Sequence, residues 1–222
     1  MNSEAIHPSA QIHPNAIIGY GSSVGANAVI GEDVVIGRNC RILAGAVIGA
    51  RPYVVSKEKL SFFPIEIDDD VLIGCNVTVQ YGVSRPTRIG RGSWINNTCS
   101  IGHDVWLGEC VLMGLSCTVS GYSNIGDRVK IGPGCTLNNR SDVGADAQIG
   151  IGSLVLHPVL SGSIVMGRPA EQRAYHIESA RRLRELLSVE RPYRRITGGR
   201  GRFLNFLPYK LKQLIKHILR KL

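Results

Sequence analysis

One histidine stands where its side chain can perform acid–base chemistry. His103 lies in the segment 94–121, WINNTCSIGHDVWLGECVLMGLSCTVSG, as the second residue after Ile101. If Ile101 points inward, His103 falls at a corner of the chain with its imidazole free to point outward. An imidazole there can act as a general base, and either Asn96 or the adjacent Asp104 could orient it. The alternatives are an ordinary surface histidine and an ordinary turn aspartate.

The cysteines and the N-terminus give no sign of a metal site or of export. The six cysteines include no C-x-x-C pair and no Cys/His cluster at zinc-finger spacing, so we expect no metal. We see no basic stretch followed by an apolar one at the N-terminus and no apolar run long enough for a transmembrane helix. We therefore expect a cytoplasmic protein with reduced thiols.

A six-residue repeat must position these side chains. Each unit is expected to form one short strand and a turn, and three units close one triangular coil. The aliphatic residue of each unit points inward, and the glycine that often follows is expected to supply the turn geometry. The repeating aliphatic positions are Ile6, Ile12, Ile18, Val24, Ile30, Ile36, Ile42, Ile48, then Ile67, Ile73, Val79, then Ile89, Ile95, Ile101, Leu107, Met113, Val119, Ile125, Ile131, Leu137, Val143, Ile149 and Val155.

A second inward position lies two residues before each aliphatic one and is expected to accept only small side chains. The fold class predicted from both positions is an all-β solenoid, a parallel β-helix of about eight coils that each contact only their neighbours. Cys99, Cys117 and Cys135 are each three repeat units apart and should stack in one buried column. The small residues are Ala16, Ala28, Ala46, Ser93, Cys99, Cys117, Ser123, Cys135 and Ala147.

The period breaks twice, near residues 50–66 and 80–88. The first break carries Arg51, Tyr53, Phe62 and Phe63, and the second carries Tyr81, Arg85 and Arg88. Loops that leave a rigid scaffold often carry binding residues. A loop that merely packs on the prism is an equally good interpretation.

The positive charge belongs to the C-terminal part of the chain. Residues 1–170 contain 12 Lys+Arg and 13 Asp+Glu, a net charge of −1, whereas residues 171–222 contain 14 and 4, a net charge of +10. We therefore divide the chain into a β-helix domain, 1–170, and a basic α-helical segment, 171–222. A basic amphipathic helix suits an anionic membrane surface or an acidic partner such as acyl carrier protein. The alternative is a helix that caps the solenoid, and nothing favours nucleic acid.

The run IGHDVWLGECVLMG and its lead-in IGCNVTVQYGVSRPTRIGRGSWINNTCSIGHD resemble the lipid A acyltransferases. Among these hexapeptide-repeat enzymes, the UDP-3-O-acylglucosamine N-acyltransferases are the most similar, over roughly residues 6 to 180. The resemblance implies a left-handed coil and a general-base role for His103. It also implies that a glycine one coil later, Gly121, donates its N–H to the oxyanion. Asn96 stands where the family tends to have an aspartate that supports the histidine.

A second resemblance lies near the end of the repeat. The run VMGRPAEQR is similar to the Gly-x-Pro-Ala loop of hexapeptide acyltransferases, which lies beside the pantetheine arm of the donor. Gly167, Pro169 and Ala170 carry the match, and Arg168 or Arg173 can meet a phosphate. The alternative is a simple exit turn.

The resemblance also implies a homotrimer with sites between subunits. The repeat starts by Ile6, so we expect no counterpart of the family's N-terminal uridine-binding domain. Trp94 and Trp106 should point outward, to a subunit interface or an acyl groove.

The leading functional hypothesis is transfer of an acyl or acetyl group from coenzyme A or acyl carrier protein to an amino sugar, which we expect to be nucleotide-linked. An acetyl-CoA-dependent O-acetyltransferase of a glycan or small molecule is the nearest rival. A non-catalytic scaffold is the third interpretation. Zinc carbonic anhydrases of this fold are disfavoured, because His103 has no partner histidine at a plausible spacing.

Overall fold

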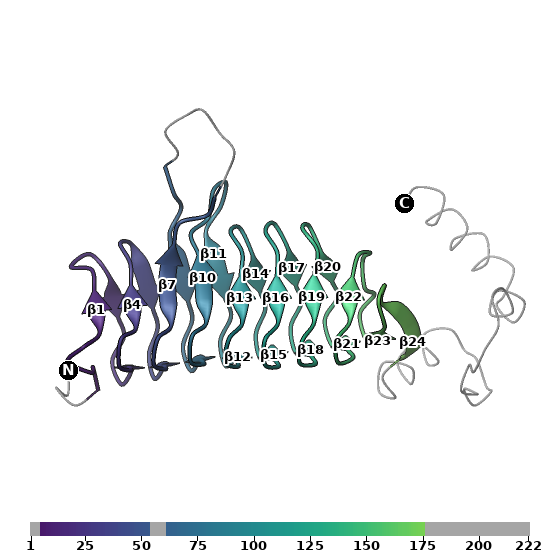
Figure 1. Cartoon of the computed structure of the whole chain (residues 1–222), viewed down its shortest axis with the longest axis horizontal. Coiled ribbons are helices and arrows are strands. Elements are labelled where there is room, and N and C mark those ends of the chain that lie inside the picture. The colour runs from purple at the N-terminus through teal and green to yellow at the C-terminus, as the bar shows by residue number, and fades with distance from the viewer. Residues whose placement is uncertain (1–4, 54–60, 176–222) are drawn as a thin grey trace, which may run out of the picture. The chain divides into compact units, whose positions relative to one another are not determined.

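The computed structural model describes residues 5–53 and 61–175, and these form a parallel β-solenoid of about eight turns (Figure 1). Each coil gives one short strand to each of three sheets. Sheet 1 contains β1 (Gln11–Ile12), β4 (Val29–Ile30), β7 (Val47–Ala50), β10 (Thr78–Gln80), β13 (Ser100–Ile101), β16 (Thr118–Val119), β19 (Thr136–Leu137) and β22 (Leu154–Val155). Sheet 2 contains β2 (Ile17–Ile18), β5 (Val34–Ile36), β8 (Ile65–Ile67), β11 (Thr87–Ile89), β14 (Trp106–Leu107), β17 (Asn124–Ile125) and β20 (Asp142–Val143). Sheet 3 contains β3 (Ser23–Val24), β6 (Arg41–Ile42), β9 (Leu72–Ile73), β12 (Trp94–Ile95), β15 (Leu112–Met113), β18 (Lys130–Ile131), β21 (Gln148–Ile149), β23 (Ser163–Met166) and β24 (Glu171–Tyr175).

Neighbouring coils pair in parallel at the predicted register of three repeat units. In the pairing of β13 with β16, Ser100 lies beside Thr118 and Ile101 beside Val119. Equivalent residues of successive coils therefore stack in columns, on the faces and at the corners alike. The predicted all-β solenoid is confirmed, and its left-handed direction stays a prediction.

Both predicted inward positions form the core. The aliphatic residues are buried, as in Ile30, Ile101 and Ile131, and removing such side chains from water is the main stabilising contribution. The second position is less restricted than predicted, because it accepts valine as well as small residues, as at Val71 and Val105.

The glycines that follow the aliphatic residues serve close packing of the coils, so the expectation of a turn role was wrong. A Cβ at Gly90 would lie 2.5 Å from the carbonyl carbon of Gly108 in the next coil. Positive φ angles occur mostly two residues further on, at Asn39 (φ 55°) and Asp104 (φ 59°) for example. The left-handed turn residue is thus often Asn or Asp, whose side chains tolerate that region.

The predicted cysteine column is buried, and its thiols bond the coils together. The Sγ atoms of Cys99, Cys117 and Cys135 donate to the carbonyl oxygens of Gly114 (3.0 Å), Gly132 (3.1 Å) and Gly150 (3.0 Å). The neighbouring Cys117 thiol and burial raise the pKa of Cys135, so its thiol stays protonated. These three cysteines are structural.

The two breaks in the period leave the prism at the same corner, between sheets 1 and 2 (Figure 1). Val34 pairs with Ile65, 31 positions later instead of 18, so thirteen residues are inserted between β7 and β8. Ile65 pairs with Thr87, 22 positions later, so four residues are inserted between β10 and β11. We call the second insertion, residues 81–86, the dyad loop, because its backbone binds Asp104 of the hydrogen-bonded pair His103–Asp104.

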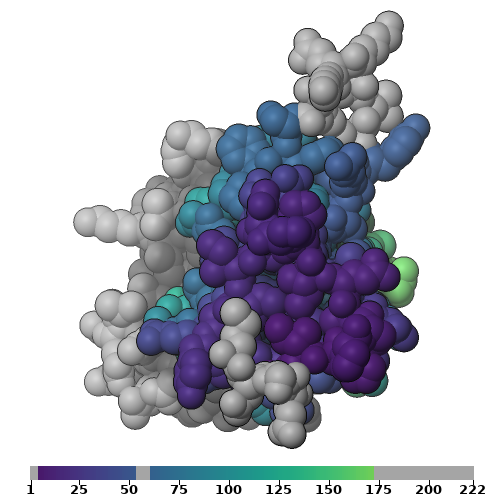
Figure 2. All heavy atoms as spheres, turned by 90° about the vertical axis from the view of Figure 1, so that its left-hand side faces the viewer, coloured from purple at the N-terminus to yellow at the C-terminus, as the bar shows by residue number. Residues whose placement is uncertain are grey.

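The C-terminal end of the solenoid differs from expectation. Glu171–Tyr175 form β24, which pairs antiparallel with β23, so the predicted helix does not begin at residue 171. This pairing satisfies the backbone groups of the last parallel strand, which a helix would leave open. The remainder of the basic segment lies outside the described residues. Figure 2 shows the other end of the prism, where the first coils (purple) face the viewer.

The described residues contain no helix of the length and hydropathy that crossing a membrane requires.

Candidate active site

His103 lies at the corner between β13 and β14, on the same edge of the prism as the two insertions. Its Nδ1 is 2.6 Å from Oδ2 of Asp104, and its side chain is 18% exposed. Because an ionised carboxylate only accepts hydrogen bonds, Nδ1 carries the proton and Nε2 has the free lone pair. A partly exposed nitrogen of this kind can remove a proton from a bound molecule.

Gly121 lies directly beside the imidazole, one coil further along. A Cβ at Gly121 would lie 2.7 Å from Nε2 of His103, so only glycine allows the ring this close. The Gly121 N–H donates to no acceptor among residues 5–53 and 61–175. A base and a residue with an unused backbone N–H donor therefore lie next to each other, and acyl transfer uses one group of each kind.

Tyr122 packs against the imidazole from the next coil. Its ring meets that of His103 edge to face, with centroids 4.8 Å apart and an interplanar angle of 90°. The Arg140 guanidinium lies 4.8 Å from the Tyr122 ring centroid, one coil further on. A phenol and a cation thus continue the corner beyond the histidine.

Asp104 is fully buried and held by the dyad loop. Its carboxylate accepts the backbone N–H groups of Val83 (3.0 Å), Ser84 (2.7 Å) and Arg85 (2.7 Å). Burial on its own would raise the pKa of Asp104. The hydrogen bonds from His103 and the three N–H groups outweigh burial and hold the pKa below the usual aspartate value.

Arg85 fastens the dyad loop from the side of sheet 2. Its Nε and Nη2 atoms donate to the carbonyl oxygen of Asp104, at 2.9 and 2.7 Å. Nη2 also donates to Oδ1 of Asn124, at 2.8 Å, and the guanidinium lies 4.3 Å from the Trp106 ring centroid. The Trp106 indole N–H in turn donates to the carbonyl oxygen of Pro86.

The structure does not bring Asn96 to this corner. Asn96 lies after β12, at the corner between sheets 3 and 1, and its side-chain amide donates to the carbonyl oxygen of Met113 at 3.0 Å. Asp104 makes the contact with the imidazole instead. Asn96 lines a mainly apolar groove of about 410 Å³ on sheet 3, together with Leu112 and Met166.

The Gly-x-Pro-Ala loop also lies apart from His103 within one chain. It turns the chain from β23 into β24, and Arg168 donates to the carbonyl oxygen of Gly152 at 3.3 Å. Gly152 stands between β21 and β22, at the corner between sheets 3 and 1. Gly167 and Ala170 donate their backbone N–H groups to Ser153 and Leu154, and Arg173 belongs to β24.

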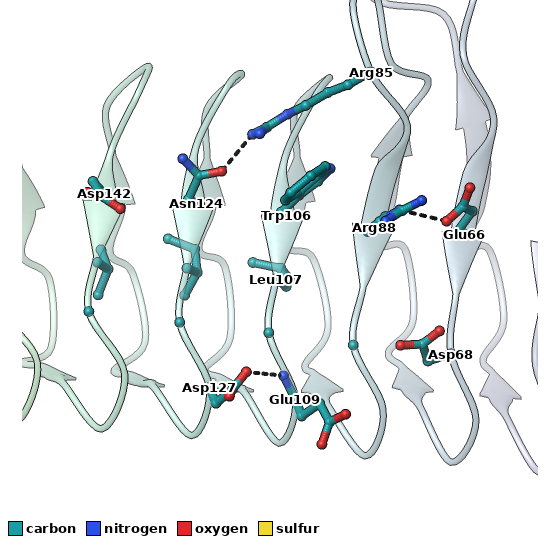
Figure 3. Close-up of a pocket in the computed structure, with 16 residues that line it drawn as sticks. Glu66, Asp68, Arg85, Arg88, Trp106, Leu107, Glu109, Asn124, Asp127 and Asp142 are labelled. Atoms are coloured by element: carbon teal, nitrogen blue, oxygen red, sulfur yellow. Dashed lines mark hydrogen bonds and ion pairs between the residues drawn. The ribbon is translucent and has the colours of Figure 1, made fainter.

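A groove of about 890 Å³ runs along the outer face of sheet 2, next to the histidine corner (Figure 3). Arg88 and Glu66 form an ion pair of 2.6 Å in it, and Arg85 reaches Asn124 above Trp106. Trp106 and Trp94 point outward as predicted, with 40% and 55% of their surfaces exposed. The groove offers polar and charged groups to an extended molecule.

The role of the dyad loop could not be predicted from the sequence, although Arg85 falls in a break of the period. Three backbone N–H groups carry no signal in residue type. Tyr122 and Arg140 were not singled out either, and only their spacing from His103 by about one and two coils could have indicated them. Among the described residues, no group of three or more His, Cys, Asp or Glu side chains could hold a metal ion.

Comparison with known proteins connects this geometry to a group of enzymes. Residues 21–50 match the model of the bacterial transferase hexapeptide (six repeats). The UDP-3-O-acylglucosamine N-acyltransferase of Maricaulis maris is 45% identical over 160 residues, which are 69% of this chain and 46% of that protein. That of Paracoccus denitrificans is 56% identical over 52 residues, 23% of this chain and 14% of that protein. The chain thus spans less than half the length of these relatives.

Solved structures share the solenoid. LpxA from Acinetobacter baumannii matches with a TM-score of 0.71 and 26% identity, covering 81% of this chain and 77% of that one. A UDP-N-acetylglucosamine acyltransferase from Bacteroides fragilis matches with a TM-score of 0.70 and 28% identity, covering 80% and 77%.

Proposed function

We propose that this hexapeptide-repeat protein is an acyltransferase that moves an acyl group from a thioester to the amine of a UDP-linked sugar. One observation carries the proposal: Gly121, whose backbone N–H donates to no acceptor among residues 5–53 and 61–175, lies against Nε2 of His103, and Asp104 holds Nδ1 of the same ring. The N-acyltransferases to which the chain is similar support the choice of acceptor.

The reaction is a direct transfer. The amine nitrogen of the sugar attacks the thioester carbonyl carbon while Nε2 of His103 takes a proton from the amine. The Gly121 N–H stabilises the negative charge on the carbonyl oxygen. The C–S bond then breaks, and the imidazolium returns its proton to the leaving thiolate. Asp104 keeps the imidazole in the required tautomer and stabilises its charged form.

Acylation of a hydroxyl group is the second candidate. It is favoured by the fold match to a protein described as a UDP-N-acetylglucosamine acyltransferase, because the amine of N-acetylglucosamine is already acylated and only its hydroxyl groups can accept. The same His103 and Gly121 would serve, because a hydroxyl and an amine each present a proton to the base. The rival O-acetyltransferase of a glycan or small molecule requires an acetyl-CoA donor.

The donor and the assembly are part of the same proposal. The thioester comes from acyl carrier protein or coenzyme A, and the Gly-x-Pro-Ala loop with Arg168 contacts its pantetheine arm. The imidazole corner and this loop lie at different corners of one prism, so a neighbouring copy in a homotrimer must bring them together. Basic residues beyond 175 remain candidates for contact with an acidic carrier protein or a membrane surface.

The test is a screen of donors and acceptors followed by mass spectrometry of the product. We expect an acylated UDP-amino sugar, and loss of the free amine in the product separates N- from O-acylation. The His103→Ala variant should lose about 10²- to 10⁴-fold in kcat with the solenoid intact. No turnover and no binding of acetyl-CoA or acyl carrier protein would reject every transferase hypothesis and favour a scaffold.

A further inference from the structure

We infer that the dyad loop, residues 81–86, is a positioning element of the active site, whose successive backbone N–H groups hold the Asp104 carboxylate against His103. The inference rests on the proposed function for its catalytic consequence, but the carboxylate site itself can be measured without turnover. The loop interrupts the hexapeptide period by four residues, so it is an addition to the coil.

The backbone of the dyad loop forms a nest for an anion. Val83, Ser84 and Arg85 all point their N–H groups at one carboxylate, at 2.7 to 3.0 Å. Successive N–H groups that converge in this way bind negative charge without any charged side chain. An ordinary hexapeptide corner has too few residues to wrap around a side chain in this manner.

The position of Asp104 requires such a nest. Its side chain is fully buried, and burying a lone carboxylate would favour its protonated form. A protonated Asp104 has less charge to offer an imidazolium, so it would support a general base poorly. The nest keeps the carboxylate ionised, and Oδ2, which also accepts the Val83 N–H, accepts the imidazole N–H at 2.6 Å.

Three further contacts fix the loop in place. The Arg85 guanidinium binds the Asp104 carbonyl oxygen and the Asn124 side chain, as described above. The chain turns so tightly at Gly82 that a Cβ there would overlap the carbonyl oxygen of Arg85, so only glycine fits. Phe63, from the first insertion, pairs with Gly82 through two backbone hydrogen bonds of 2.9 and 3.2 Å. The first insertion therefore supports the second, and the second supports Asp104.

The charged and titratable groups around Asp104 come from successive coils at the same corner of the prism. Arg85 faces it from the dyad loop, and His103 lies on its own corner. The Tyr122 ring, from the next coil, meets the imidazole edge to face, and the Arg140 guanidinium lies over the Tyr122 ring. None of these is altered by removing a single backbone N–H, so the effect of the nest can be isolated.

The decisive experiment replaces one amide by an ester. Placing lactic acid at position 84 of the full chain removes the 2.7 Å N–H donor, and Ser84→Ala is the matched control that keeps it. We expect the ¹³Cγ titration of Asp104 to move upward by about one pH unit in the ester relative to the control. We also expect kcat to fall about tenfold with KM unchanged, and the acid limb of the kcat profile to move to higher pH.

Equal titration midpoints for Asp104 in the ester and the control overturn the inference. An Arg85→Met variant, with Arg85→Lys for comparison, provides a second measurement if the ester protein is poorly folded. We expect Arg85→Met to raise the Asp104 midpoint, and an unchanged midpoint counts against the inference. If the unaltered protein turns over no donor, the proposed function fails, while the titration still decides the role of the loop.

Discussion

His103 is restrained from three sides by its neighbour in sequence and by the next coil. Asp104 holds Nδ1, Tyr122 meets the ring at its edge, and Gly121 leaves room for Nε2. A base held in this way loses little conformational entropy when a substrate arrives. The arrangement also makes the site sensitive to single atoms.

A methyl group at Gly121 should disable the base. In Gly121→Ala the Cβ would lie 2.7 Å from two atoms of the imidazole, so the ring must leave Asp104 or Tyr122. We expect a loss of kcat of about 10²-fold or more. Steady-state kinetics measures this, and circular dichroism and thermal unfolding should show the solenoid intact. A variant with normal kcat would remove Gly121 and the close ring contact from the mechanism.

Asp104→Asn should change how stability depends on pH. The folded-state pKa of Asp104 lies below that of the unfolded chain, so its stabilisation is fully present above the unfolded value of about 3.9. That stabilisation is lost as the pH falls through the folded pKa. The difference in unfolding free energy between wild type and variant should therefore be largest near neutral pH and shrink in acid. Denaturant titrations at several pH values measure it, and a constant difference contradicts the assignment.

At the residue scale, the sequence predicted where His103 and Gly121 lie better than it predicted which side chain hydrogen-bonds to the imidazole. The period of six placed His103 outward and Gly121 one coil away, because the stacking of every third unit is a property of the repeat. The choice between Asn96 and Asp104 stayed open in the sequence. It depends on an insertion whose backbone, and not its side chains, binds the carboxylate.

At the scale of the hexapeptide, two glycine positions have different purposes. The glycine after the aliphatic residue avoids the next coil, whereas the residue two positions later needs a left-handed backbone. The sequence pattern shows only that glycine is frequent. It does not distinguish the packing role of the first position from the turn role of the second. Their separation required the distance between coils.

Substitutions at Gly90 and Gly134 should distinguish these purposes. In Gly90→Ala the Cβ meets the Gly108 backbone at 2.5 Å, which should cost about 1–3 kcal/mol of unfolding free energy. Gly134 has φ 69°, and a Cβ there would make only an ordinary contact of 3.9 Å with the Gly152 Cα; Asn occupies other corners with φ near 55°. Gly134→Asn should therefore be neutral within about 0.5 kcal/mol. Denaturant unfolding of both variants tests the distinction, and equal effects would contradict it.

At the scale of the whole solenoid, the three faces differ in charge. Sheet 2 carries Glu66, Arg88 and Asp142, and sheet 3 carries Arg41 and Lys130. The described strands of sheet 1 carry no charged residue. Their outward residues are Gln11, Val29, Val47, Thr78, Ser100, Thr118, Thr136 and Leu154. An uncharged face next to the histidine corner suits association between copies better than the other two.

Charge on sheet 1 should therefore break the proposed homotrimer. Thr118→Glu places a carboxylate in the middle of this face, and three copies around an axis would bring three of them together. We expect monomers by analytical ultracentrifugation, with activity lost in parallel. Gln148→Glu adds the same charge to sheet 3 and should remain trimeric. A trimeric Thr118→Glu protein would place the interface elsewhere.

The confinement of both insertions to one corner has a consequence for how this site can change. Each strand needs only its counterpart in the adjoining coil, and that pairing resumes directly after each insertion, in β8 after the first and in β11 after the second. The length of chain at the histidine corner can therefore change without changing the strand pairing or the packing of the core. New loops grafted between β10 and β11 would leave the solenoid unchanged and alter only the anchoring of the base.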